Sequence, residues 1–236
     1  MSAQSRGRTG LPASSEAARH GTGEADLTVM LAAHEAFRRD LGKLATAASR
    51  ARQWSPERQS AVRAGWEVFQ RQLHVHHRGE DTTLWPLLRA RLDGSEAAAS
   101  VLDAMQAEHE TIDPLLAAVD LAFGFRAAPG DVFSLPVAAD AVGELATQLS
   151  LHLAHEERDA LPLIGQAMTA REWRDAGRSM GRQPGTGVSF VAEFFGWLLD
   201  GAAPGQRTAV LATLPPVMRP LIAGVFRPVY ARRASW

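Results

Sequence analysis

The sequence predicts an all-α fold, a helix bundle built from two copies of one helical hairpin. Each copy has a lone histidine and, further along, a His-x-x-x-Glu pair, with an acid after the glutamate and a proline ten positions after the histidine. Apolar residues recur at helical spacing around all of these positions, the pattern of helices that bury one face. Capping and turn residues separate the segments.

The first hairpin begins after a polar stretch, residues 1–23, which reads as a disordered tail without the apolar core of a secretory signal. The first helix is expected over residues 24–52. Ser55-Pro56-Glu57 supplies a cap and a first-turn proline for a second helix that reaches about Leu92. Asp93-Gly94-Ser95 then predicts a turn.

The second hairpin follows the same order. Its helices are expected over residues 96–125 and 135–170, with a connecting loop over residues 127–134 that contains Pro129-Gly130-Asp131. Pro86 and Pro162 lie just beyond the two His-x-x-x-Glu turns. Since proline lacks a backbone donor and crowds the preceding turn, each is expected to kink or end its helix.

Residues 171–236 are predicted to form a helical C-terminal extension. Residues 188–199 are strongly apolar, but this stretch contains Glu193 and is too short to cross a bilayer. Packing of the extension against the bundle is the favoured interpretation. A membrane-surface helix, or an element for a protein partner or for substrate access, stays open as an alternative.

Six side chains in the two hairpins predict a di-metal site. A histidine and a glutamate four residues apart lie on one helix face, so both can reach the same metal pair. Such groups within apolar stripes would cost several kcal/mol each if they were buried without partners, and a divalent metal pair removes that cost. The predicted ligands are His34, His76, Glu80, His109, His152 and Glu156.

The other histidines and two neighbouring acids are not predicted to bind metal directly. His20 lies in the polar tail and is expected to be solvated. Three more histidines are expected at the rim of the bundle or as outer partners of the ligands: His74, His77 and His155. Asp81 and Glu157 point about 100° away from the ligand face of an ideal helix. They are therefore expected to face solvent or to hydrogen-bond to metal-binding histidines.

These motifs resemble the hemerythrin-like (HHE cation-binding) domain family, over residues 26–168. The resemblance implies an up-down-up-down four-helix bundle with a di-iron centre in which Glu80 and Glu156 bridge the metals. Oxygen carriers of the family have a fifth histidine where this chain has Asp113, and an aspartate one position beyond that of Glu156. These departures favour the bacterial members linked to oxygen, peroxide or nitric oxide. Asp113 is expected to point toward the metals or an adjacent water, with a position at the rim, bonded to solvent or backbone, as the alternative.

Four nitrogens and two carboxylates for two metals favour iron over closed, tetrahedral zinc, although manganese or a mixed pair also suits these ligands. Three functions are consistent with the sequence: binding or sensing of O2, NO or peroxide, an enzyme that decomposes peroxide or reduces NO, and an iron-handling or regulatory module. A net charge of −1 does not indicate a basic surface that would bind nucleic acid. The chain has no cysteine, which excludes disulfides and thiolate ligands and fits the expected cytoplasmic location.

Overall fold

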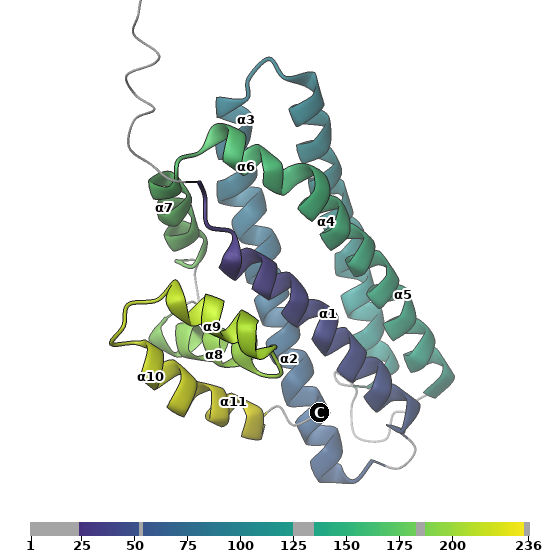
Figure 1. The fold of residues 1–236 in the computed structure, drawn as a ribbon. Helices are drawn as coiled ribbons and strands as arrows, with labels where there is room; N and C mark the ends of the chain where they lie inside the picture. Colours follow the sequence, from purple (N-terminus) through teal and green to yellow (C-terminus); the bar gives the residue numbers. More distant parts are fainter. Residues whose placement is uncertain (1–23, 52–53, 125–134, 183–186, 234–236) are drawn as a thin grey trace, which may run out of the picture.

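Four long helices pack side by side and form the bundle (Figure 1). The computed structural model describes residues 24–51, 54–124, 135–182 and 187–233, and these ranges contain helices and no strands. The long helices are α1 (Thr28–Ser49), α2 (Pro56–Gly79), α4 (Glu96–Ala122) and α5 (Leu135–His155). Helix α1 contacts both α2 and α5, and α4 contacts α5, so the predicted helical bundle is confirmed.

The capping residues begin the helices where the sequence predicts. Ser55 accepts a hydrogen bond from the backbone N–H of Arg58 and Pro56 is the first residue of α2, and Ser95 accepts from Ala98 at the start of α4. Gly94, at φ +84°, makes the turn between the hairpin's helices, a conformation that favours glycine. The helices end earlier than expected: α1 at Ser49 and α4 at Ala122.

A π-helical turn follows each His-x-x-x-Glu pair. One, η3 (Glu80–Leu84), leads into α3 (Trp85–Arg91), and the other, η4 (Glu156–Ala160), leads into α6 (Leu161–Ala167). In both, the backbone N–H that ends the turn donates five residues back, to the carbonyl of the glutamate. The widened turn accommodates the proline that comes next, which has no N–H and would crowd a regular turn.

The expected long helix over residues 135–170 is therefore wrong in detail. It consists of α5, η4 and α6, and a separate helix, α7 (Ala170–Met180), begins at residue 170. Thr169 and Glu172 form a capping box at its start, which explains the break because this motif satisfies the first free N–H groups of a new helix.

A layer of histidines and glutamates divides the apolar interior in two. On α1 the layer residue His34 lies between Met30, which belongs to one apolar cluster, and Phe37, which belongs to the other. The same change of cluster occurs across the ligand turns of α2, α4 and α5. The predicted apolar stripes are largely buried, but Leu31 is exposed. The layer is thus enclosed by apolar residues on both sides, which keep bulk water out.

The C-terminal extension consists of α7, α8 (Val188–Leu199), α9 (Pro204–Ala212), α10 (Arg219–Leu221), η5 (Ile222–Phe226) and α11 (Arg227–Arg233). Of these, α8 and α9 contact α1, and α7 and α11 contact α2. The buried indole of Trp197 donates to Asp40 over 2.7 Å, and Lys43 donates to Asp200 over 3.0 Å. Gly196 permits a close approach, since a Cβ there would lie 2.9 Å from the carbonyl oxygen of Phe226. The bonds to Asp40 and Lys43 fix the extension on the bundle, and the approach of Gly196 to Phe226 packs α8 on η5 within the extension.

None of the helices in the described ranges combines the length and the apolar character of a membrane-crossing segment. The most apolar of them, α8, buries Trp197 and Phe190 against the rest of the protein. This arrangement agrees with packing against the bundle rather than with a free apolar face.

Candidate metal centre

The six side chains predicted as ligands meet in the polar layer. His34, His109 and His152 are buried and each comes from a different long helix. Glu80 and Glu156 are the first residues of the two π turns and are completely buried. His76, on α2, keeps 9% of its side-chain surface exposed. The duplicated sequence pattern therefore brings its six members to one level of the bundle.

Each glutamate lies between a histidine of its own helix and a histidine of another helix. The carboxylate of Glu80 lies 3.3 Å from Nε2 of His76 and 3.7 Å from Nε2 of His109. That of Glu156 lies 3.2 Å from Nε2 of His34 and 4.0 Å from Nε2 of His152. The two carboxylates thus occupy equivalent central positions, although their own helices differ.

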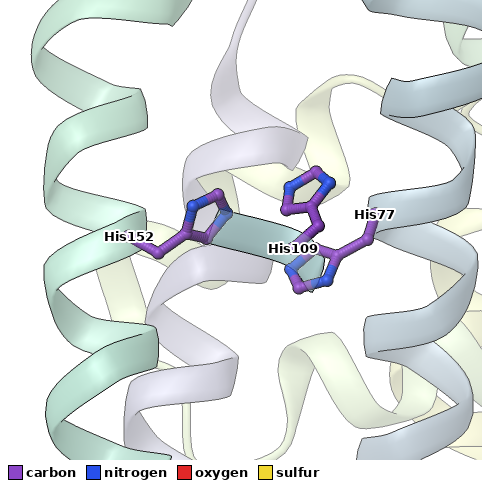
Figure 2. A group of neighbouring side chains, drawn as sticks. All are labelled: His77, His109 and His152. Carbon is purple, nitrogen blue, oxygen red and sulfur yellow. The ribbon is translucent and has the colours of Figure 1, made fainter. Parts of the chain in front are cut away.

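A fifth histidine joins the layer. The ring of His77 stacks on that of His109, with centroids 4.0 Å apart, and it meets His152 edge-on at 5.2 Å. Figure 2 shows His77 and His152 reaching from two helices toward His109. The expectation that His77 lies at the rim is wrong, because its side chain is buried within the layer. Its role as an outer partner of the ligands stays a prediction. Position 77 matches Leu153 in the second hairpin, and that buried leucine is the sequence signal for an interior position.

The layer contains two groups whose potential ligand atoms lie within 4.8 Å of one another. One group is His34, His76 and Glu156, and the other is His77, His109 and His152. Both have the donor types and the spacing needed to hold a metal ion. The two groups are chemically different, since one has a carboxylate where the other has a third imidazole.

Two acids that follow the glutamates hold histidines of the layer. Nδ1 of His109 lies 2.9 Å from Asp81, and Nδ1 of His34 lies 2.8 Å from Glu157. These acids stand at the same position of the two hairpins, and the prediction that they hydrogen-bond to histidines of the predicted ligand set is confirmed. A carboxylate at Nδ1 orients the ring and directs Nε2 into the layer.

Glu108, for which the sequence predicted no role, forms hydrogen bonds with two histidines. Its carboxylate accepts from Nδ1 of His152 over 2.9 Å and from Nδ1 of His155 over 2.7 Å. His155 also lies 3.3 Å from Asp159 through Nε2 and is 26% exposed. The predicted outer position of His155 is thereby observed. A chain of hydrogen-bonding groups connects the buried layer with the surface.

Asp113 does not face the layer. Its side chain is 64% exposed and lies 3.8 Å from Nε2 of His74, which is itself 58% exposed. Ile112, three residues after His109, is buried and takes the interior position on this turn of α4. The expectation that Asp113 points toward the metals is wrong for that reason, and His74 is found at the predicted rim. His20 lies outside the described residues.

Burial and neighbouring charges shift the pKa values of the layer. Burial lowers the pKa of His76 and His77 well below the usual value, with a further contribution from nearby imidazoles. Burial also raises the pKa of Glu80 well above its usual value, assisted by Glu156. Metal binding requires neutral imidazole, and this environment favours that form.

His34 and Glu156 behave as a charged pair. Burial alone would lower the pKa of His34, but Glu156 and Glu157 together outweigh it and raise the pKa to about 9. Burial would likewise raise the pKa of Glu156, but His34, assisted by His76 and His152, outweighs it and lowers the pKa to about 2. Without a metal, one proton held at Nε2 of His34 therefore partly compensates the carboxylate.

The layer holds nine buried side-chain atoms that form no hydrogen bond: Nε2 of His34, His76, His77, His109 and His152, and both carboxylate oxygens of Glu80 and Glu156. Buried polar atoms normally find a partner, because leaving one without any costs free energy. Neutral imidazole nitrogens and carboxylate oxygens are ligands for divalent transition metals. The donor set therefore fits a metal pair.

Comparison with known proteins agrees with this chemistry. No match was found among curated proteins or among solved structures. The family model described as hemerythrin HHE cation binding domain matches residues 25–164, which is more than half of the chain and includes every residue of the layer. The chain belongs to the hemerythrin HHE cation-binding domain family.

Proposed function

We propose that the protein holds two iron ions in the histidine–glutamate layer and uses them to bind or sense O2, NO or peroxide. The nine buried atoms that form no hydrogen bond, all of them of metal-ligand type, carry this proposal. His34 and His76 would serve one ion, and His77, His109 and His152 the other. Glu80 lies beside His76 and His109, and Glu156 lies beside His34 and His152, so each carboxylate would contact both ions. The proposal includes an up-down-up-down order of the four long helices.

The composition of the donor set supports iron. Five imidazoles and two carboxylates exceed what structural zinc takes, since such zinc is closed and tetrahedral. Iron and manganese accept more ligands and can leave positions for a small molecule. A bound iron pair would supply redox-active metal. The chain's own contribution is to orient the imidazoles through Asp81, Glu157 and Glu108, and to exclude water with the apolar clusters above and below.

Metal analysis of the purified full-length protein, with optical spectra before and after O2, NO or H2O2, tests the proposal. We expect two irons per chain and near-ultraviolet charge-transfer absorption that changes when one of these molecules binds. One tightly held zinc per chain, without iron after iron-replete expression, would contradict it.

Turnover is a second candidate, favoured by the chain from His152 through Glu108 to the partly exposed His155. Such a chain can carry protons between the layer and solvent, as decomposition of peroxide or reduction of NO requires. Sustained O2 evolution from H2O2 that falls in His155→Leu, at unchanged iron content, would support an enzyme. A centre that binds these molecules without consuming them supports the binding or sensing role.

A further inference from the structure

The two hairpins differ at the residue before the lone histidine. In the second hairpin this residue is Glu108, whose carboxylate accepts from Nδ1 of His152. In the first it is Ala33, and the matching histidine is His76. Among the residues that the structure describes, no carboxylate contacts Nδ1 of His76. The first hairpin thus has no acid that would orient His76 as Glu108 orients His152 in the second hairpin.

A cavity takes the place of this acid. It has a volume of about 780 Å³ and is lined by both Ala33 and His76. Its walls come from α1, α2, α7 and α8, and most of them are apolar: Val29, Met30, Phe37, Val75, Phe190 and Phe194. The small side chain of Ala33 leaves room beside the imidazole, and the exposed part of His76 belongs to the cavity wall.

The cavity is much larger than the small molecules considered above require. A water molecule takes about 30 Å³ of liquid volume, and O2 or peroxide is of similar size. Pockets for organic ligands have volumes of about 300–1,000 Å³ and are mostly apolar with a few placed polar groups. The volume and the lining therefore point to an organic molecule with an apolar body.

The polar groups of the cavity favour an anion. When a histidine binds metal through Nε2, Nδ1 carries a proton and donates, commonly to a carboxylate. At the exposed end of the cavity lie Arg174 and Arg182, for which no acidic partner occurs in the described ranges. Arg178 also lines the cavity and pairs with Asp175, and the acids of the lining are Glu24 and Asp26, so basic side chains outnumber acidic ones. An approaching carboxylate would be attracted to this end and would find a donor at the other.

We propose that the cavity binds a monocarboxylic acid with an apolar chain or ring, whose carboxylate accepts a hydrogen bond from Nδ1 of His76. The ligand's carboxylate would stand beside His76 as Glu108 stands beside His152. The coupling of this ligand to the metals, and the proton that metal binding at Nε2 places on Nδ1 of His76, rest on the proposed di-iron function, but binding of the acid to the cavity does not. Occupancy would then change the orientation and basicity of one metal-binding imidazole, so the organic acid acts on the same centre as the small ligand.

Calorimetric titration of the full-length protein with decanoate and with decan-1-ol tests the ligand class. We expect decanoate to bind at least about tenfold more tightly than the alcohol, because a charge-assisted hydrogen bond is lost with the alcohol. Equal affinity for the two compounds, or no binding of decanoate, would overturn the proposal. Iron content is measured separately, so iron without decanoate binding overturns only this proposal, and decanoate binding without iron leaves it standing.

Two glycines provide a matched test of where decanoate binds. Gly177 on α7 lines the cavity and Gly165 on α6 does not, and a Cβ on either would meet no atom within 4 Å. Gly177→Phe should fill the cavity and weaken decanoate binding at least about tenfold, while Gly165→Phe leaves it unchanged. Unchanged binding in Gly177→Phe would place the ligand elsewhere and overturn the assignment.

The position of the carboxylate is tested by charge changes at the two ends. Ala33→Glu supplies the missing acid from the chain itself and should abolish the preference for decanoate over decan-1-ol. Arg174→Gln should leave most of this preference, because an exposed charge is screened by solvent. If Arg174→Gln alone removes it, the carboxylate lies at the exposed end and the placement beside His76 is wrong. Decanoate should also shift the optical spectrum of the iron-loaded protein, but not that of Gly177→Phe.

Discussion

The two hairpins share a framework and differ in what surrounds their metal-type residues. Both have a π turn that begins at the glutamate, and both have an acid after it that holds the lone histidine of the other hairpin. Their differences include two positions next to the metal-type histidines: His77 corresponds to Leu153, and Ala33 corresponds to Glu108. A duplicated fold can thus keep its symmetry in the backbone while two substitutions make the metal positions unequal.

The two differences act on opposite sides of the layer. His77 adds a third imidazole to the group of His109 and His152, which supplies more protein donors there. Ala33 opens a cavity beside His76 instead of providing an acid. The His34–His76 side therefore has fewer imidazoles and more space. We expect incoming molecules to approach this side, whereas the other side is held by protein ligands and by Glu108.

The largest effect is expected from a change that removes what the hairpins share. Glu156→Ala should release both metals, because this carboxylate lies beside histidines of two helices. Metal bound at about 1,000 times its Kd stabilises a fold by about 4 kcal/mol. For a chain of this size that corresponds to a melting temperature lower by about 10 °C.

Metal analysis and thermal melting of Glu156→Ala and Glu80→Ala, beside His74→Ala, check this expectation. His74 lies at the exposed rim, so its variant should match the wild type, as should His20→Ala. Wild-type iron content together with a wild-type melting temperature in both glutamate variants would rule out the bridging assignment.

A smaller effect should follow when the first hairpin is made to resemble the second at position 77. His77→Leu introduces the residue found at position 153 and removes one imidazole from the three-histidine group. We expect the affinity for one of the two metals to fall at least about 100-fold, more than the loss usual for an outer partner, while the other metal is retained. Stoichiometric metal titration followed by calorimetry measures the two affinities.

His74→Leu is the matched control, since it changes the same residue type on the same helix at an exposed position. If His77→Leu still binds two metals with wild-type affinities, His77 only packs on His109 and is no ligand.

Residue 77 also shows which features of the fold and the site the sequence could predict. The helical spacing of apolar residues predicts the four long helices and the six paired residues, because these features repeat along single helices. The direction of a side chain on an isolated helix does not say what lies beside it. His77 points about 100° away from His76 on an ideal helix, and only the packing of α2 near α4 makes that direction an interior one.

The π turns and the extension depend on longer-range effects. A π turn begins six residues before each of Pro86, Pro162 and Pro228, and the last of these turns contains no glutamate, so the turns accompany the prolines, which periodicity does not reveal. The bond from Trp197 to Asp40 joins residues far apart in the chain. Its pairing could not be read from either segment alone. The cavity beside Ala33 is likewise formed by helices of both the bundle and the extension.

A loss of metal affinity smaller than that of His77→Leu is expected when the second hairpin is made to resemble the first at position 108. Glu108→Ala removes the acceptor from Nδ1 of His152 and from that of His155. Loss of such an outer partner typically costs about 10- to 100-fold in metal affinity. We expect one metal to weaken within this range, with both still bound at saturation, and Glu108→Gln to recover part of the loss.

Glu110→Ala provides the comparison, because Glu110 is an exposed acid on the same helix. Equal affinities in Glu108→Ala and Glu110→Ala would mean that the acid at position 108 does not support the layer, and the contrast between the hairpins at this position would lose its meaning.

The smallest effect is expected at Asp113, the position where oxygen carriers of the family have a histidine. In this chain the layer already receives its fifth histidine from α2, and Ile112 fills the interior side of α4 at this turn. Asp113 is 64% exposed, so Asp113→His should place an imidazole in solvent near His74. We expect metal affinity, optical spectrum and reactivity with O2 or H2O2 to match the wild type. The melting temperature should change by less than about 2 °C, as for most surface substitutions.

A new ligand-field band or a longer-lived oxygenated form would show instead that α4 can turn this position inward, and that His77 and residue 113 compete for the same metal. The double variant His77→Leu with Asp113→His separates these cases, because recovery of the lost affinity requires residue 113 to reach the layer.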